Sequence, residues 1–236
     1  MGGFLYMKSL LELTKDLVQI HSTADRPEEL VRAIEYVAHE FVAFPSLFVK
    51  RYEQNRKHAL VVSTQNTLTP DILLMAHLDV VPAQDELFHL RQEGSRVYGR
   101  GVCDNKGPAV VIMRLMQEIS TWESQPSIAA MFTTDEEIGG ADGSGYLINE
   151  IGYRPKVGLV PDNGQSLEDL VLENKGIVMF RLTAKGKQGH GSRPWEGENA
   201  IDKLIGSYLK VKERFLESIS PDVWAGLTHL NSQYAQ

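Results

Sequence analysis

Residues 72–79 read Ile-Leu-Leu-Met-Ala-His-Leu-Asp, and the fold class follows from them. The five apolar residues predict a strand that is buried on both faces, as in the centre of a sheet that helices cover on both sides. Comparable apolar runs lie at 128–132 and 157–160, and helical periodicity marks 106–119 and 144–151. This alternation predicts an α/β fold with a mostly parallel central sheet, covered by helices and connected by right-handed crossovers.

The N-terminal part adds elements of the same kind. Apolar residues three to four positions apart predict a helix over 7–18. Pro27, followed by two glutamates, predicts the start of a second helix, which ends before Pro45. Short β-like runs follow at 47–52 and 59–63. These segments are compatible with further layers and strands of the same sheet.

The pattern changes near Glu173. Residues 176–185 alternate in a way that predicts a long strand, and residues 198–215 carry the apolar spacing of a helix. A strand and a helix after a complete α/β unit indicate that a second domain begins here. We therefore predict one domain over 1–174 and the incomplete start of an α+β domain over 175–236.

Composition excludes several classes of function. The chain has 24 Lys and Arg against 31 Asp and Glu, a net charge of −7, and no basic block, which argues against nucleic-acid binding. No segment approaches the ~18 apolar residues of a membrane span, and charged residues interrupt the N-terminal apolar run where a signal peptide would need continuity. The single cysteine, Cys103, cannot form an internal disulfide. We expect a soluble, cytoplasmic protein without membrane or nucleic-acid partners.

Acidic residues and a histidine gather where the predicted strands end. The segments are His77-Leu78-Asp79, residues 99–108 with Asp104 among three glycines, residues 133–140 with Asp135, Glu136 and Glu137, and residues 161–164 with Asp162. Taken singly, each has an ordinary structural explanation: a strand-end histidine, an N-cap or turn aspartate, or an acidic first turn of a helix. Cys103, with no histidine near it in sequence, is interpreted as a buried structural thiol.

Together, these segments point to a metal site. Open α/β sheets place their ligands at the carboxyl ends of the strands, so the segments are predicted to converge. One imidazole and several carboxylates suit a hard or borderline divalent cation. A pair of such cations shares a bridging carboxylate, activates water and polarises a carbonyl. The sequence has no GxSxG nucleophile elbow, phosphate-binding loop, GxGxxG after a strand or HExxH, which argues against the competing enzyme classes.

Five ordered motifs carry a family resemblance. They are MAHLDVVPA (75–83), GRGVCDNKGP (99–108), TTDEEIGG (133–140), PDNG (161–164) and QGHGSRPWEGENAI (188–201). In this order and spacing, the chain resembles the co-catalytic zinc metallopeptidase family of acetylornithine deacetylase, succinyl-diaminopimelate desuccinylase, aminoacylase, carboxypeptidase G and carnosinase. The resemblance implies a zinc-exopeptidase-like catalytic domain followed by a lid or dimerisation domain.

The resemblance also implies the metal ligands. His77 and Asp162 would bind one zinc ion, Asp104 would bridge two ions, and Glu137 would bind the second. Two Zn²⁺ are expected in the complete family architecture, with Co²⁺ or Mn²⁺ as possible substitutes. The family further tends to have a cis peptide bond after the bridging aspartate, which here is Asp104–Asn105.

The same resemblance implies three roles in catalysis. Glu136 would be the general base, which takes a proton from the attacking water and returns it to the leaving amine. Asp79 would orient His77. His190 would sit in the lid domain and help to stabilise the oxyanion in a neighbouring subunit's site. A turn histidine is the structural alternative for His190. The implied partner is therefore a second copy of the chain, in a homodimer formed through the lid domain.

The chain departs from the family pattern at its C-terminal side. A further histidine ligand of the second metal is expected far downstream, and His229 lies too early to be assigned to it. We interpret the chain as a fragment with weak binding of the second metal, impaired activity, and exposed apolar faces that favour association.

The predicted function is zinc-dependent hydrolysis of an amide bond in N-acyl amino acids or dipeptides, through metal-activated water. The alternative is a non-catalytic metal-binding or oligomerising remnant of the same family. A phosphoesterase is disfavoured by the acidic composition and by the lack of a phosphate-binding loop. The individual substrate stays open.

Overall fold

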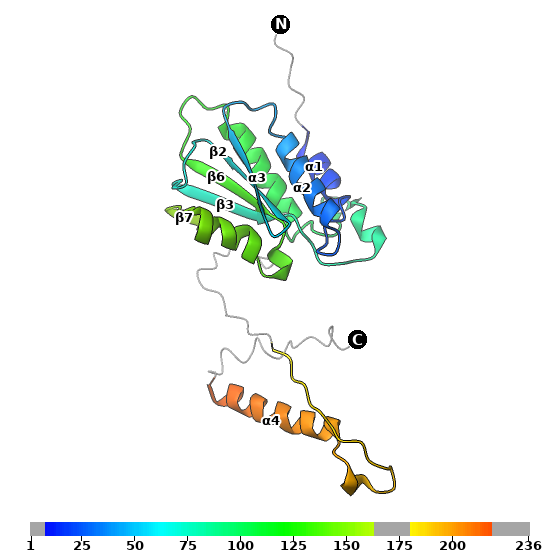
Figure 1. The fold of residues 1–236 in the computed structure, drawn as a ribbon. Helices are drawn as coiled ribbons and strands as arrows, with labels where there is room; N and C mark the ends of the chain where they lie inside the picture. The colour runs from blue at the N-terminus through cyan, green and yellow to red at the C-terminus, as the bar shows by residue number, and fades with distance from the viewer. Residues whose placement is uncertain (1–7, 163–179, 219–236) are drawn as a thin grey trace. The chain divides into compact units, whose positions relative to one another are not determined.

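The computed structural model describes residues 8–162 and 180–218 (Figure 1). Contacts divide the chain into two units, Met1–Val171 and Leu172–Gln236, and each is described here by itself. The first unit contains the sheet and the acidic segments that end at its strands.

The first unit is built from three helices, seven short strands and four helical turns in its described part. The helices are α1 (Leu10–Val18), α2 (Pro27–His39) and α3 (Lys106–Ile119). The strands are β1 (Phe48–Gln54), β2 (Lys57–Ser63), β3 (Ile72–His77), β4 (Arg91–Glu93), β5 (Arg96–Tyr98), β6 (Ile128–Thr133) and β7 (Val157–Leu159). The turns are η1 (Asp85–Phe88), η2 (Glu136–Ile138), η3 (Ala141–Gly145) and η4 (Leu147–Ile151).

The central sheet has the strand order β1-β2-β6-β3-β7. The β3/β6 and β3/β7 pairs are parallel, whereas β1/β2 and β2/β6 are antiparallel. The α/β class is confirmed, but the prediction of a mostly parallel sheet is wrong, because the sheet is mixed.

A tight turn explains the antiparallel edge. Asn55 and Arg56 connect β1 to β2, and both have positive φ, 48° and 63°. A two-residue connection of this kind can only reverse the chain, so the two strands form a hairpin rather than a crossover. The sequence Asn-Arg carries a weaker turn signal than Asn-Gly, so the sequence alone does not predict the reversal between β1 and β2.

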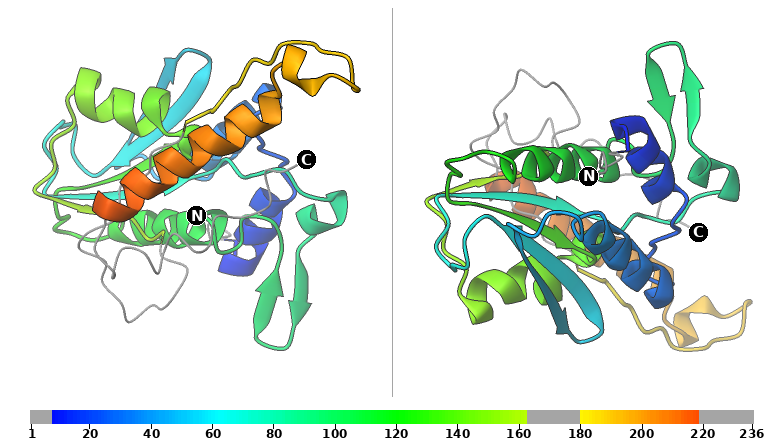
Figure 2. Two further views of the ribbon diagram at one scale, coloured as in Figure 1. Left: turned by 90° about the horizontal axis from the view of Figure 1, so that it is seen from below. Right: turned by 90° about the horizontal axis from the view of Figure 1, so that it is seen from above.

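The core lies on both faces of this sheet. Leu60, Leu74 and Phe132 belong to the cluster that packs against α1, α2 and α3. The alternate residues, among them Val61, Leu73 and Met131, pack against Leu147 and Tyr153 on the other side. Figure 2 shows α3 and the 141–151 segment on opposite sides of the strands. β3 and β6 are therefore covered on both faces, as their unbroken apolar sequences predict.

Two elements differ from their predicted form. β7 was expected to be a buried strand, but Val157 and Leu159 are exposed, because in the described structure β7 is the last strand of the sheet and pairs only with β3. The predicted helix over 144–151 is instead a pair of π-helical turns, η3 and η4. Its entry at Gly140 has φ +67°, a conformation that glycine adopts without strain.

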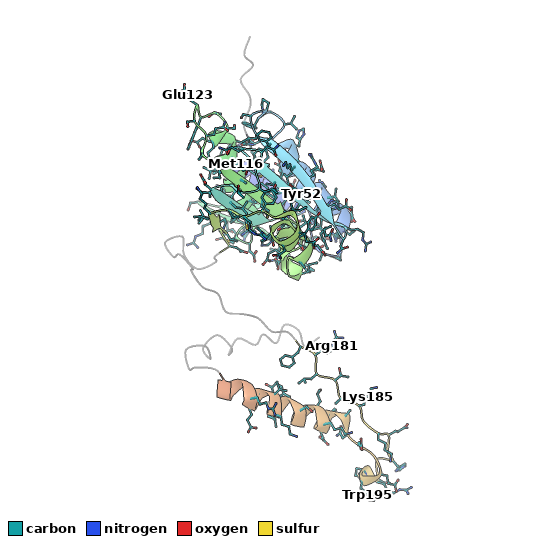
Figure 3. The ribbon with its side chains drawn as sticks, turned by 60° about the vertical axis from the view of Figure 1, so that its left-hand side comes forward. Tyr52, Met116, Glu123, Arg181, Lys185 and Trp195 are labelled. Atoms are coloured by element: carbon teal, nitrogen blue, oxygen red, sulfur yellow. The ribbon has the colours of Figure 1, made fainter. Side chains whose placement is uncertain are left out.

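The second unit contributes a helix, α4 (Ala200–Ser218), close to the predicted 198–215. Before it lie the turn η5 (Pro194–Glu196), whose Trp195 is drawn in Figure 3, and an isolated bridge between Lys187 and Glu198. Residues 180–185 are not in a strand, so the prediction for 176–185 is wrong over this part, and 176–179 lie outside the described residues. A strand needs a ladder of backbone hydrogen bonds to a neighbouring strand, and the strand pairs of the described residues do not include 181–185. The predicted α+β domain is not evident here.

A helix crosses a bilayer only if it is long and apolar enough. In the part of the chain that the structure describes, none of them combines the length and the apolar character of a membrane span.

Candidate metal centre

His77 occupies the carboxyl end of β3, where the sheet buries it to 3% exposure. Its Nδ1 lies 2.9 Å from the backbone oxygen of Asp79. A carbonyl oxygen can only accept, so Nδ1 carries the proton in this contact. Nε2 is thereby directed to the neighbouring loops, and that is the nitrogen a metal would use.

Asp104 reaches His77 from the loop between β5 and α3. Its Oδ1 lies 2.9 Å from His77 Nε2. The loop turns at Gly101, with φ +83°, and is closed by a hydrogen bond from the Lys106 N–H to the Gly101 oxygen. The Asp104–Asn105 peptide bond is cis, so that prediction is confirmed.

Asp162 completes a group of three. Its Oδ2 lies 3.7 Å from His77 Nε2. One ligand atom each of His77, Asp104 and Asp162 lies within 4.8 Å of the others. The side-chain amide of the buried Asn105 donates to the Pro161 oxygen at 3.0 Å, which ties the Asp104 loop to the residue before Asp162. The prediction that these distant segments converge is therefore confirmed for these three residues.

The two glutamates follow β6 on the turn η2. Glu136 Oε2 lies 3.8 Å from His77 Nε2, at the rim of the group. The backbone N–H of Glu137 donates to Asp79 Oδ2 at 2.9 Å. Within residues 8–162, the carboxylate of Glu137 is not part of the three-residue group.

Asp79 contacts both His77 and η2. It is 1% exposed, and its Oδ1 lies 3.4 Å from His77 Nδ1 while Oδ2 accepts from Glu137. The backbone oxygen of Asp79 therefore holds the ring of His77 while its carboxylate holds the start of η2, as expected of a residue that orients a metal ligand.

Crowded charges shift the pKa values of the group. Burial lowers the pKa of His77, but the Asp79 carboxylate outweighs it, and the net effect raises the pKa to about 9. Burial raises the pKa of Glu136, and the nearby Asp162 carboxylate raises it further. Burial and the Asp104 carboxylate also raise the pKa of Glu137. An imidazolium partly offsets the acidic oxygens, which is the role that a divalent cation would take over.

The side chain of Asp135 holds the start of η3. It is 2% exposed, and its Oδ2 accepts the backbone N–H groups of Asp142 and Gly143, both at 2.9 Å. A Cβ on Gly143 would lie 2.0 Å from Asp135 Oδ1, so this approach requires glycine. Burial raises the pKa of Asp135.

Two predictions concern residues outside the group. Cys103 is predicted to be buried, but this is wrong: Cys103 is exposed, as is the neighbouring Asp104. His190 belongs to the second unit, where its Nδ1 accepts the backbone N–H of Ser192 at 3.2 Å, which fits a turn histidine. Its role in a neighbouring subunit's site stays a prediction.

Sequence reasoning missed the supporting residues Asn105 and Lys106. Asn105 donates to a backbone oxygen, and so does Lys106, which is fully buried and donates to Leu17 and Ile20. Backbone acceptors leave no side-chain pattern in the sequence. Their only signal was their place beside Asp104 in a glycine-rich motif.

The site can be tested through Asp79. We expect Asp79→Asn to weaken Zn²⁺ binding by about 10–100-fold, the usual effect of changing a residue that orients a metal ligand. Asparagine keeps the shape, but its NH₂ group would face either the Glu137 N–H or the His77 Nδ1–H, and donor would meet donor. Competition titration with a chromophoric chelator measures the change. Asp71→Asn, at an exposed residue paired with Lys156, is the matched control, and equal affinities of the two variants would contradict the prediction.

Comparison with known proteins gives concordant findings. The family model described as peptidase family M20/M25/M40 matches residues 73–210. A protein named "Probable carboxypeptidase" from Aspergillus terreus is 28% identical over 214 residues, covering 85% of this chain and 48% of its own. A protein named "Probable succinyl-diaminopimelate desuccinylase" from Staphylococcus aureus is 29% identical over 171 residues, covering 69% of this chain and 42% of its own. The chain spans about half the length of the curated relatives it matches.

Solved structures support the fold. Aminopeptidase PepT from Bacillus cereus aligns with a TM-score of 0.52 at 14% identity, covering 85% of this chain and 55% of its own. An M20 family metallo-carboxypeptidase from Sulfolobus solfataricus aligns with a TM-score of 0.50 at 17% identity, covering 66% and 37%. At these identities the likeness concerns the fold alone.

Proposed function

Because the chain belongs to peptidase family M20/M25/M40, we propose that it is a metal-dependent hydrolase that cleaves an amide bond in dipeptides or N-acyl amino acids. The observation that carries the proposal is the convergence of His77 and Asp162, which follow the neighbouring parallel strands β3 and β7, with Asp104 from the loop between β5 and α3. The names of the relatives, carboxypeptidase and desuccinylase, agree with this class of substrate.

The residues present fit a divalent cation. Two ligands about 2.0–2.2 Å from a tetrahedral ion lie about 3.3–3.6 Å apart. The distances from His77 Nε2 to Asp104 and Asp162, 2.9 and 3.7 Å, bracket that separation. One nitrogen with carboxylate oxygens suits Zn²⁺, and Co²⁺ and Mn²⁺ accept similar sets. We propose that these three residues hold the first ion, and that Asp104 and Glu137 contribute to a second.

In the proposed chemistry, Glu136 carries the proton and Asp79 orients His77. A bound divalent cation would supply Lewis acidity, which makes water more acidic and a carbonyl carbon more electrophilic. Glu136 takes a proton from the attacking water, whose oxygen bonds to the carbonyl carbon. The C–N bond then breaks, and Glu136 returns the proton to the leaving nitrogen. Asp79 keeps His77 in the tautomer with its proton on Nδ1.

A second candidate is a metal-binding protein without hydrolytic activity. The observation that favours it is the position of Glu137, whose carboxylate is not part of the three-residue group among the described residues. Such a site would hold a single ion.

Hydrolysis with defined metals separates the two. The metal-free protein is loaded with Zn²⁺, Co²⁺ or Mn²⁺ and incubated with a panel of dipeptides and N-acyl amino acids, and the release of free amine is measured by chromatography. We expect hydrolysis that a chelator removes and added metal restores. Stoichiometric metal binding without hydrolysis of any panel member would support the second candidate. Hydrolysis that persists at full chelation would contradict both.

A further inference from the structure

A buried lysine lies directly beside the candidate metal loop. Lys106 is the first residue of α3 and is fully buried. Its Nζ donates to the backbone oxygens of Leu17 at 2.9 Å and Ile20 at 2.6 Å, where α1 ends. The lysine therefore connects the loop that carries Asp104 to the carboxyl end of a helix far away in the sequence.

Ser22, just after the end of α1, also bonds to the segment that follows His77, at Leu78 and Val80. The Val80 N–H donates to the Ser22 oxygen at 2.9 Å, and the Ser22 hydroxyl donates to the Leu78 oxygen at 2.5 Å. We call residues 17–22 the anchor segment. It contacts both the segment that follows β3, at Leu78 and Val80, and the segment that carries Asp104, through Lys106.

The loop that follows β3 and the loop that carries Asp104 also contact each other, at Val80 and Gly101. A Cβ on Gly101 would lie 2.9 Å from Val80 Cγ1 and 3.0 Å from Lys106 Cδ. The Gly101 backbone therefore packs directly on the stem of Lys106, and the Lys106 N–H donates to the Gly101 oxygen at 2.7 Å. A shift of the lysine would move the loop that ends at Asp104.

Lys106 meets a buried helix end. Leu17 and Ile20 are 0% and 2% exposed, so their carbonyl oxygens need a donor from the protein, and Lys106 supplies it at the cost of burying an amine. Because Lys106 begins α3, its contacts with Leu17 and Ile20 connect two parts of the chain that are distant in sequence. Its contacts do not depend on charge, since the neutral amine still has two N–H donors for two carbonyl oxygens.

We propose that Lys106 is a positioning residue of the metal centre, which fixes the Asp104 loop relative to His77 by tying both to the anchor segment. The inference rests on the proposed metal site and not on hydrolysis. Lys106 touches neither substrate nor metal in this proposal.

The test replaces Lys106 by methionine, which has a similar length but no donor. We expect Lys106→Met to weaken Zn²⁺ binding by about 10–100-fold, as loss of an outer support does. In the metal-free protein, we expect faster hydrogen exchange of peptides that cover residues 99–106. The matched control is Val37→Ala, a core change in α2, compared at a temperature that gives equal stability. The control should leave metal affinity and exchange of this loop unchanged.

The possible results are distinguishable. If the wild-type protein binds no divalent cation, the proposed function fails. Hydrogen exchange of residues 99–106 in Lys106→Met still tests whether Lys106 holds the Asp104 loop. If the wild type binds and Lys106→Met binds equally tightly with an unchanged loop, the inference is overturned. If Lys106→Met does not fold, Ser22→Ala takes its place, because it removes the Leu78 contact of the same anchor segment. The inference then requires weaker binding and faster exchange of residues 78–80, and wild-type behaviour overturns it.

Discussion

Replacing Glu136 by glutamine is expected to lower kcat for amide hydrolysis by about 10²–10⁴-fold, the range that a positioned general base contributes. Glutamine keeps the size of the side chain but cannot accept and return a proton. Glu136 Oε2 lies 3.8 Å from His77 Nε2, so it is close to the metal group without belonging to it. Burial and the neighbouring carboxylates raise its pKa, which brings it closer to the range of an effective base.

The control separates a base from a ligand. Metal affinity is measured on the same variant, and we expect it to change much less than kcat. Glu150→Gln, on an exposed glutamate of η4, is the matched substitution and should behave as wild type. If Glu136→Gln retains full kcat, it is not the base. If it loses the metal and the activity together, the residue is a ligand and the assignment of Glu136 and Glu137 has to be revised.

The candidate site could be predicted where the chemistry is local to a motif. His77 and Asp162 follow β3 and β7, and neighbouring parallel strands end at the same edge, so the convergence of these two residues follows from the sequence pattern. Asp104 lies in the loop between β5 and α3, and its place beside His77 is visible only in the structure. The supporting contacts of Asn105 and Lys106 do not follow from the sequence. These side chains donate to backbone oxygens about 56 and 86–89 positions away, and no sequence pattern marks such acceptors.

The fold was predictable for the same reason and to a similar extent. The buried strands β3 and β6 and the helix α3 follow from runs and periods of apolar residues. The direction of β2 does not, because alternation of side chains is the same in parallel and antiparallel strands. Only the two-residue turn at Asn55 and Arg56 reverses the chain, and their positive φ values are visible only in the structure.

The second large effect is expected at the histidine. His77→Ala should weaken Zn²⁺ binding by more than about 100-fold, because changing a residue that merely orients a ligand already costs 10–100-fold. The substitution removes the nitrogen donor, whose distances to Asp104 and Asp162 are 2.9 and 3.7 Å.

Metal selectivity makes this experiment specific. Without His77, the remaining donors of the group are carboxylate oxygens, which suit Mn²⁺ better than they suit Zn²⁺. We therefore expect the preference for Zn²⁺ over Mn²⁺ to shrink, while His89→Ala, at an exposed histidine, leaves both affinities unchanged. Competition titrations with each metal measure the ratio. A variant that loses affinity for both ions equally would indicate a collapsed strand end rather than a lost ligand, and unchanged Zn²⁺ binding would remove His77 from the site.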